Sequence, residues 1–414
     1  MKDHHRLVIV SDVHLGAERR PWLRKLGVTP EQWDAPFQEA ARWSIENEAD
    51  AFIVAGDLFD QRRPTPLDYM RARQVLGNHA TAGIVVAGNH DIGVTGDVDA
   101  LWAEQYTIRG RPRVESQWGI QLVGLPWPRP SDWELPEGTI EDDITLTRSA
   151  VFNRLEDLAA NLDPERPAIL VGHCMVAYGG YLQSGYPAFT EPDGPGLMLG
   201  KDVVLPYTAL TDLPNIGGVF LGHVHNPSQP GYVGSTQPTD WGEAGQAKSF
   251  TVVDITRCDG TAAELHENHG PVGSDCCVNG WAYETRKIPY TTSLKLLALE
   301  GEFIPPFEIT TDWWDQIDFH SGDAKYDGIR STVTVKEGDN LPIEDVRNEL
   351  LEYADYVEVI VEREVKRAAR VETAEPLAHM SAADALDVWL EQRGTNENDL
   401  APVRELFGKI VESS

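Results

Sequence analysis

The stretch GVFLGHVHNP, residues 217–226, places two histidines one residue apart at the end of an apolar run. The run indicates a buried strand that ends at Gly222. Because alternate residues of an extended chain point to the same side, His223 and His225 can direct both imidazoles at one point. Such a pair suits a metal ion, but two solvated loop histidines would give the same pattern. The interpretation therefore depends on whether the rest of the chain supplies further ligands.

Composition limits the class of protein. The chain has 414 residues, enough for two or three domains, and its 41% hydrophobic and 8% aromatic content is typical of a globular protein. No apolar run reaches the roughly 18 residues that a membrane span needs, and the N-terminal apolar stretch is too short for a signal peptide. We therefore expect a soluble, cytoplasmic protein that does not associate with membranes.

The net charge is strongly negative. Lys and Arg number 35 against 66 Asp and Glu, which gives −31 at pH 7. Such a chain does not attract a phosphate backbone through its overall field. A nucleic-acid substrate would have to be attracted by local arginines and bound cations.

Strands and helices alternate in the first half of the chain. Buried strands are predicted at residues 7–10, 51–56, 83–88, 120–125, 168–173 and 217–222. Helices are predicted at roughly 31–48, 67–78 and 142–162. This alternation favours an α/β layered architecture, with residues 231–235 and 249–255 as a later antiparallel continuation.

The character of the chain changes after residue 283. A strand, a helix and another strand suggest a small α+β domain up to about residue 365. A polar linker then leads to a tail with helical periodicity, in which one helix would start near Ser381 and stop at Gly394. Two short amphipathic helices of this kind suit either partner docking or packing on their own core.

Polar residues follow five of the six predicted strands. They are Asp12, His14, Asp57, Asp60, Asn89, His90, Asp91, His173, His223 and His225. In open α/β sheets, groups at the carboxyl ends of strands converge on one crevice. Oxygen and imidazole donors without a thiolate suit Mn²⁺, Fe²⁺ or Zn²⁺. There are more donors than one tetrahedral ion needs, so we predict two ions bridged by Asp57, an arrangement that hydrolyses phosphoesters.

These motifs resemble those of a known superfamily. The ordered series DxH, GDxxD, GNHD, GH and GHxH is similar to that of the calcineurin-like metallophosphoesterases. More narrowly, SDVHLG (11–16), AGDLFDQRRPTP (55–66), AGNHD (87–91) and GHVHNPSQPGYVGSTQPTDWGEAGQAKSF (222–250) resemble the Mre11/SbcD nucleases. The resemblance is strong over roughly residues 6–256 and looser over 283–365.

The resemblance implies a fold and a domain division. The fold would be a layered metallophosphoesterase β-sandwich flanked by helices, with a small α+β capping domain and a C-terminal helical tail. Residues 1–275 would form the nuclease domain, 283–365 the capping domain, and 366–414 a linker with a helical partner-docking segment.

The resemblance also implies roles for the site residues. One metal would take Asp12, His14, Asp57 and His225, and the other Asp57, Asn89, His173 and His223, with two Mn²⁺ per chain or other divalent ions in their place. His90 would contact the scissile phosphate and help the 3′-oxygen leave. Asp60 stands where archaeal and eukaryotic members carry histidine, so it either orients His90 or only supports the loop. Four arginines would either contact the DNA backbone or form an ordinary solvated surface, two interpretations that the sequence supports equally: Arg19, Arg20, Arg62 and Arg63.

The function implied is a Mn²⁺-dependent DNA nuclease in double-strand break repair and recombination. It would act as a 3′-to-5′ exonuclease on duplexes and as an endonuclease on single strands or hairpins. A Rad50/SbcC-like SMC ATPase would dock on the C-terminal helices, and a homodimer would form through an apolar helical face such as 67–78.

Two alternatives stay open. One is another two-metal phosphodiesterase or phosphatase, although protein phosphatases usually show GNHE and GDxxDRG where this chain has GNHD and GDLFDQRR. The other is a metal-free scaffold, which the presence of a competent donor at all seven ligand positions disfavours.

Overall fold

The computed structural model describes residues 2–77, 83–91, 106–135, 143–178, 202–258, 276–304, 308–309, 325–336 and 341–363. Contacts divide the chain into two units, residues 1–333 with 342–360 and residues 334–341 with 361–414. The predicted C-terminal helices, at 366–414, lie outside the described residues. The candidate site residues all lie in the first unit.

The larger sheet carries the first three sequence motifs. Its strand order is β12-β13-β11-β1-β2-β3-β4. The strands span Cys276–Val278, Trp281–Pro289, Ser249–Arg257, His4–Val10, Ala51–Ala55, Ile84–Val86 and Tyr106–Ile108. Strands β1 to β4 are parallel and β11 runs antiparallel to β1. The carboxyl ends of β1, β2 and β3 therefore meet at one edge, as predicted.

The second sheet supplies the histidines of the later motifs. Its order is β10-β7-β6-β5, with strands at Val219–Gly222, Ala168–His173, Ile120–Leu125 and Arg113–Gln117. A separate pair, β8 and β9, spans Met175–Ala177 and Val204–Pro206. The strand predicted at 231–235 is wrong: only isolated bridges form at Tyr232 and Ser235. Gly231 and Gly234, with φ of 76° and 91°, break the extended path there.

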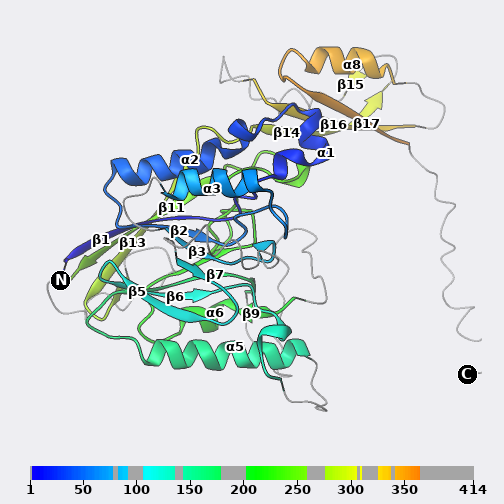
Figure 1. Cartoon of the computed structure of the whole chain (residues 1–414). Helices are drawn as coiled ribbons and strands as arrows, with labels where there is room; N and C mark the ends of the chain where they lie inside the picture. Colours follow the sequence, from blue (N-terminus) through cyan, green and yellow to red (C-terminus); the bar gives the residue numbers. More distant parts are fainter. Residues whose placement is uncertain are drawn as a thin grey trace, which may run out of the picture. The chain divides into compact units, whose positions relative to one another are not determined.

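The two sheets pack face to face, with helices on both outer faces (Figure 1). The core between them includes Ile9 and Ile53 from the first sheet and Ile169 and Phe220 from the second. Helices α2 and α3, at Pro30–Glu46 and Pro66–Gly77, cover the first sheet, and α5 and α6, at Asp143–Ala160 and Tyr207–Thr211, cover the second. The predicted β-sandwich flanked by helices is confirmed, and with it the three predicted helices.

Helix α2 shows how local sequence sets these boundaries. Thr29 forms a capping box with Gln32: the Thr29 hydroxyl accepts from the Gln32 amide, and the Gln32 side chain accepts from the Thr29 amide. Pro30 occupies the first turn, where its missing N–H is no loss. Trp33 and Phe37, one turn apart, are fully buried, so this face anchors the helix to the core.

A third sheet follows in the sequence. Its order is β15-β14-β16-β17, with strands at Glu308–Ile309, Leu296–Ile304, Gly328–Val335 and Val357–Arg363 and helix α8 at Ile343–Leu350. The predicted start of the capping domain at residue 283 is corrected, because that residue lies within β13. Strand β13 pairs with β11 over its whole length and so belongs to the first sheet.

Candidate metal centre

The first loop of the site follows β1 and has an unusual backbone. Asp12 and His14 both have φ of 49°, in the left-handed region that non-glycine residues rarely adopt. Their amides donate hydrogen bonds of 3.0 Å to the carbonyls of Gly56 and Asp57. The buried indole of Trp33 donates to the His14 carbonyl at 3.0 Å. Such backbone costs about 1–3 kcal/mol per residue and persists only where the surroundings enforce it.

Glycine is required where two motifs approach each other. Gly56 has φ of 90°, and a Cβ at this position would collide with the imidazole of His173. A Cβ at Gly88 would collide with the carboxylate and the amide nitrogen of Asp57. The glycines of the GDxxD and GNHD motifs therefore let functional side chains lie directly against the main chain.

Asp91 joins the second and third loops. Its buried carboxylate accepts hydrogen bonds from the amides of Gly88, Leu58 and Phe59 at 2.9, 3.3 and 3.1 Å. Burial, together with the charge of Asp57, raises the pKa of Asp91 to about 6. Asp91 thus ties the second and third loops together.

One group of donors forms around His14. Its Nε2 lies 3.3 Å from Nε2 of His225 and 3.8 Å from Oδ2 of Asp57. Nε2 of His225 lies 3.6 Å from Oδ1 of Asp12. Ligands bound at about 2.0–2.2 Å to one ion are roughly 3–3.5 Å apart, so this spacing is close to that of a metal shell.

A second group forms around His173 and shares Asp57 with the first. Nε2 of His173 lies 3.0 Å from Oδ1 of Asn89 and 3.4 Å from Oδ2 of Asp57. Nδ1 of His223 lies 3.3 Å from the same Asn89 oxygen. The structure therefore brings all seven predicted ligands together, with one Asp57 oxygen between the two groups. Asp12 also lies close enough to Asp57 and His173 to share an ion with them.

The chemistry of this donor set fits a cation. Burial holds the pKa of His14 well below its usual value and lowers that of His223 to about 3. Both imidazoles are therefore neutral at pH 7 and offer lone pairs. Burial opposes ionisation of Asp57, yet the nearby His173 and His14 hold the pKa of that carboxyl well below its ordinary value.

His173 differs from the other ligands in its protonation. Burial disfavours its charge, but the Asp57 carboxylate and a hydrogen bond to it raise the pKa of His173 to about 9. Its Nδ1 lies 2.9 Å from the Ala55 carbonyl, which can only accept, so Nδ1 carries a proton and Nε2 faces Asn89 and Asp57. A bound cation would take the place of the Nε2 proton.

His90 lies at the edge of the two groups. Its Nε2 is 4.0 Å from Oδ2 of Asp57, and its side chain is 35% exposed. Its Nδ1 lies 2.5 Å from the main-chain carbonyl of Asp60. The Asp60 carboxylate instead forms an ion pair with Arg20 and lies 3.6 Å from Nδ1 of His14. Asp60 thus contacts His90 through its backbone, which any residue at this position would offer.

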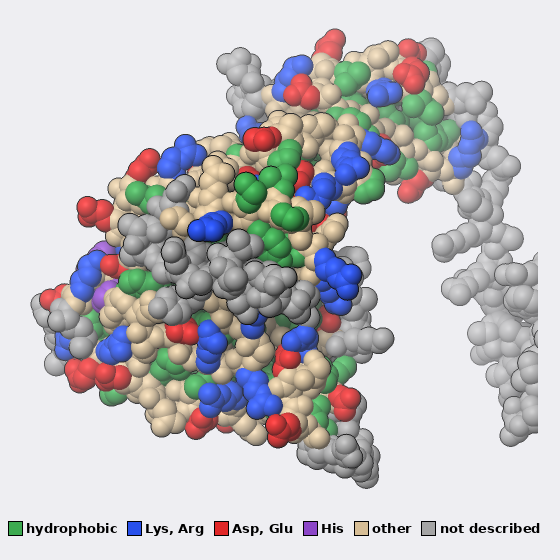
Figure 2. Space-filling model, in the orientation of Figure 1, with side chains coloured by type: hydrophobic (Ala, Val, Ile, Leu, Met, Phe, Trp, Pro, Cys, Tyr) green, Lys and Arg blue, Asp and Glu red, His purple; other side chains and the backbone are tan. Residues whose placement is uncertain are grey.

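Two of the four arginines predicted to contact DNA form ion pairs within the fold. Arg19 forms a bidentate ion pair with Asp68 at 2.8 Å, and Arg20 holds Asp60 and the Thr239 carbonyl. Both guanidinium groups thus pair with internal carboxylates, and DNA contacts by Arg19 and Arg20 stay a prediction. Arg62 and Arg63 are exposed. Among the described residues on the face seen in Figure 2, positive and negative side chains are interspersed.

Some residues of the site were missed by sequence reasoning. Glu243 lies 2.8 Å from Nδ1 of His225, and Lys248 in turn contacts Glu243. The signal available was the polar content of residues 239–248 shortly after the GHxH motif. The ring centroid of Trp127 lies 4.7 Å from that of His223, so Trp127 also lines the centre.

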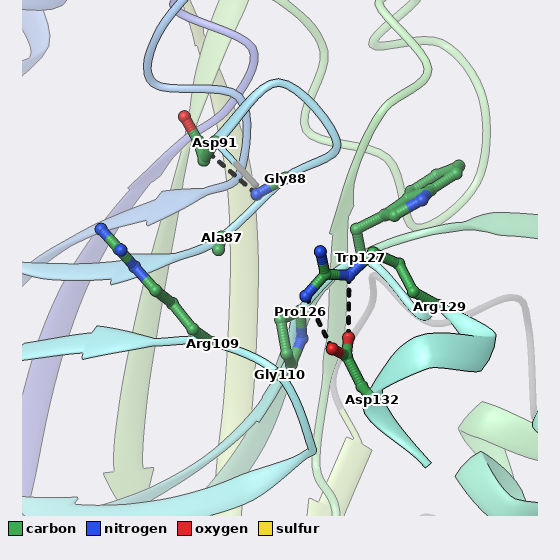
Figure 3. Close-up of a pocket in the computed structure, with 9 residues that line it drawn as sticks. All are labelled: Ala87, Gly88, Asp91, Arg109, Gly110, Pro126, Trp127, Arg129 and Asp132. Carbon is green, nitrogen blue, oxygen red and sulfur yellow. Dashed lines mark hydrogen bonds and ion pairs between the residues drawn. The ribbon is translucent and has the colours of Figure 1, made fainter. Parts of the chain in front are cut away.

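A small pocket lies beside the third loop (Figure 3). It is lined by Ala87, Gly88, Asp91, Arg109, Gly110, Pro126, Trp127, Arg129 and Asp132. Its volume of about 40 Å³ holds roughly three water molecules. Arg129 is paired with Asp132 at 2.6 Å. None of the seven predicted ligands lines this pocket, and it is too small for a nucleotide.

The sandwich with imidazole and carboxylate donors at one edge defines a metal-dependent hydrolase of phosphoesters. Residues 5–227 match the family model of the calcineurin-like phosphoesterases, which is more than half of the chain. The chain belongs to this family, and the resemblance of its ordered motifs to that superfamily is confirmed. No helix in the described part of the chain is both long and apolar enough to cross a membrane.

Proposed function

We propose that this protein is a Mn²⁺-dependent DNA nuclease of the Mre11/SbcD type. The observation that carries the proposal is the double donor set that shares Asp57, with His90 beside it. Its support beyond the family is the stretch from Gly222 to Phe250, whose sequence resembles the corresponding motif of those nucleases. Glu243 and Lys248 of this stretch lie directly behind His225.

The roles of the chain's own residues follow from this geometry. Asp12, His14, Asp57 and His225 would hold one divalent cation, and Asp57, Asn89, His173 and His223 the other. When bound, two such ions activate water and offset charge on a phosphodiester. The substrate phosphate would lie at the exposed side of the centre, within reach of His90.

His90 would move the proton in the cleavage step. The Asp60 carbonyl can only accept a hydrogen bond, so Nδ1 of His90 carries a proton and Nε2 faces the centre. When the ring carries a proton on both nitrogens, it can donate the Nε2 proton to the departing 3′-oxygen, which leaves a neutral ring with its proton on Nδ1. Arg62 and Arg63 are exposed on the loop that carries Asp60 and would supply local positive charge for the DNA backbone.

Substrate preference tests the proposal. The Mn²⁺-loaded full chain is expected to degrade linear duplex DNA faster than it hydrolyses p-nitrophenyl phosphate or cyclic AMP, at equal concentrations of phosphoester. Degradation from a 3′ label and opening of a DNA hairpin would be followed on gels, with the Asp57→Asn variant as a control for contaminating nucleases. A higher rate on either small substrate would favour a phosphatase or cyclic-nucleotide phosphodiesterase instead.

The partner proposal concerns the tail and helix α3. A Rad50/SbcC-like SMC ATPase would dock on the C-terminal helices, in residues 366–414. A homodimer would form through α3, where Leu67 and Met70 are 52% and 67% exposed although both are apolar.

Truncation after residue 375 separates these two interactions. The shortened chain is expected to keep Mn²⁺-dependent cleavage of short DNA and to remain a dimer in light scattering, because α3 is retained. It should no longer capture a Rad50/SbcC-like SMC ATPase in a pull-down. Recovery of the ATPase by the shortened chain would contradict docking on the tail, and a monomeric full-length chain would contradict the dimer.

A further inference from the structure

A buried carboxylate stands behind one predicted metal ligand. Oε1 of Glu243 lies 2.8 Å from Nδ1 of His225, and Glu243 is 8% exposed. A carboxylate accepts, so Nδ1 of His225 donates and the Nε2 lone pair is left facing the donors of the first group. Nε2 is the atom that lies 3.3 Å from His14 and 3.6 Å from Asp12.

The carboxylate is itself held from several sides. The amide and hydroxyl of Thr239 lie 3.2 and 2.6 Å from Oε1 of Glu243. Oε2 accepts from Ser235 at 3.2 Å and from Lys248 at 2.5 Å. Lys248 is 3% exposed and also donates to the main-chain carbonyl of His225 at 3.1 Å. Every oxygen of this buried carboxylate has a donor, so it stays charged and cannot rotate freely.

We propose that Glu243 is a positioning residue for the metal centre: it fixes the tautomer and ring orientation of His225, and Lys248 holds Glu243 in place. The proposal rests on the metal centre of the proposed function but not on DNA as the substrate. Where a carboxylate accepts a hydrogen bond from the second nitrogen of a metal-binding histidine, its replacement typically weakens metal binding by about 10- to 100-fold. Glu243 would act through His225 alone, so the second group of donors should be unaffected.

Mn²⁺ binding to the full-length Glu243→Gln variant tests this. Glutamine keeps the size of the side chain but removes the charge, and its amide can turn its NH₂ toward His225. In isothermal calorimetry, one of the two Mn²⁺ ions is expected to bind about 10- to 100-fold more weakly, and the other to keep its affinity. With Co²⁺ as a probe, the visible absorption of the weakened site should change, because the imidazole orientation changes.

Asp240→Asn is the matched control. Asp240 is an exposed carboxylate three residues away that accepts from the Gly242 amide, a bond that asparagine also makes. The Asp240→Asn substitution removes the same charge from the same loop without changing any contact of His225. Affinity for both ions is expected to stay within about twofold of the wild type, since a solvent-screened charge contributes little. An equal loss of affinity in Asp240→Asn would attribute the effect to net charge and overturn the proposal.

Folding is controlled with a double variant. Glu243→Gln leaves Lys248 as a buried cation without its partner, so the single variant is compared by near-ultraviolet circular dichroism with Glu243→Gln/Lys248→Met, which removes both charges. The double variant carries the same prediction for Mn²⁺. Unchanged affinity at both sites in a folded variant would overturn the role of Glu243. A wild type that binds no Mn²⁺ would overturn the metal centre itself, and with it the proposed function.

Discussion

Replacing His90 with alanine is expected to lower the rate of phosphodiester cleavage by about 10²- to 10⁴-fold while Mn²⁺ binding is retained. The ring belongs to neither group of donors and stands 4.0 Å from Asp57 at the exposed side of the centre. A proton donor at this position acts in the transition state, so kcat falls while the ligands of the cations are unchanged. Single-turnover rates on a duplex substrate and calorimetry with Mn²⁺ measure the two quantities separately.

The control for this variant is His4→Ala. His4 is also a partly exposed histidine, with a side chain 46% exposed near Asp254, and it lies at the opposite end of β1 from the donors. Its loss should change neither rate nor metal binding. Cleavage by His90→Ala within about threefold of the wild-type rate would remove His90 from the mechanism. Loss of one Mn²⁺ together with activity would instead make His90 a metal ligand.

Replacing Asp57 with asparagine is expected to affect both cations at once. One oxygen of Asp57 lies 3.8 Å from His14 and 3.4 Å from His173, the central imidazoles of the two donor groups. Asparagine keeps the shape but removes the charge that both groups share. Stabilisation by two metal ions contributes several kcal/mol, so we expect activity to fall by at least about 10³-fold. Calorimetry should show weaker binding of both Mn²⁺ ions, not of one.

The matched control is Asp157→Asn on α5. Asp157 is 61% exposed and pairs with Arg154 on the helix surface. The substitution therefore removes the same charge far from the donors. Melting curves of both variants check that the fold is intact. If Asp57→Asn lost only one ion, Asp57 would not be the shared ligand, and the two donor groups would have to be reassigned.

Much of the site could be predicted because its signals are local in the sequence. A short apolar run that ends in Asp, Asn or His predicts a buried strand. It also predicts that these polar residues lie at the edge of the sheet where the strand ends. Five of the six runs end in this way, and parallel strands bring such ends together. That is why the donors could be predicted from the order of the motifs, whereas their division into two sets came from the family resemblance.

Other features could not be predicted because they depend on partners that are distant in the sequence or on the main chain. Every residue has a main-chain carbonyl, so the residue type gives no sign of a contact to it. The contact of His90 with the carbonyl of Asp60, and not with its carboxylate, is therefore visible only in the fold. The ion pair of Arg19 with Asp68 on α3, 49 residues later in the chain, is also visible only in the fold. The antiparallel pairing of β13 with β11 likewise moves the domain boundary.

The amino-acid sequence alone determined the six buried strands, the three long helices and the kind of donor at five of the strand ends, because burial and hydrogen-bonding patterns repeat within a few residues. Tertiary structure decided which charged side chains pair with one another inside the protein and which face solvent. The chain from Lys248 through Glu243 to His225 is the clearest case. Its geometry exists only once a loop folds back behind the sheet edge, where low water access makes each such contact strong.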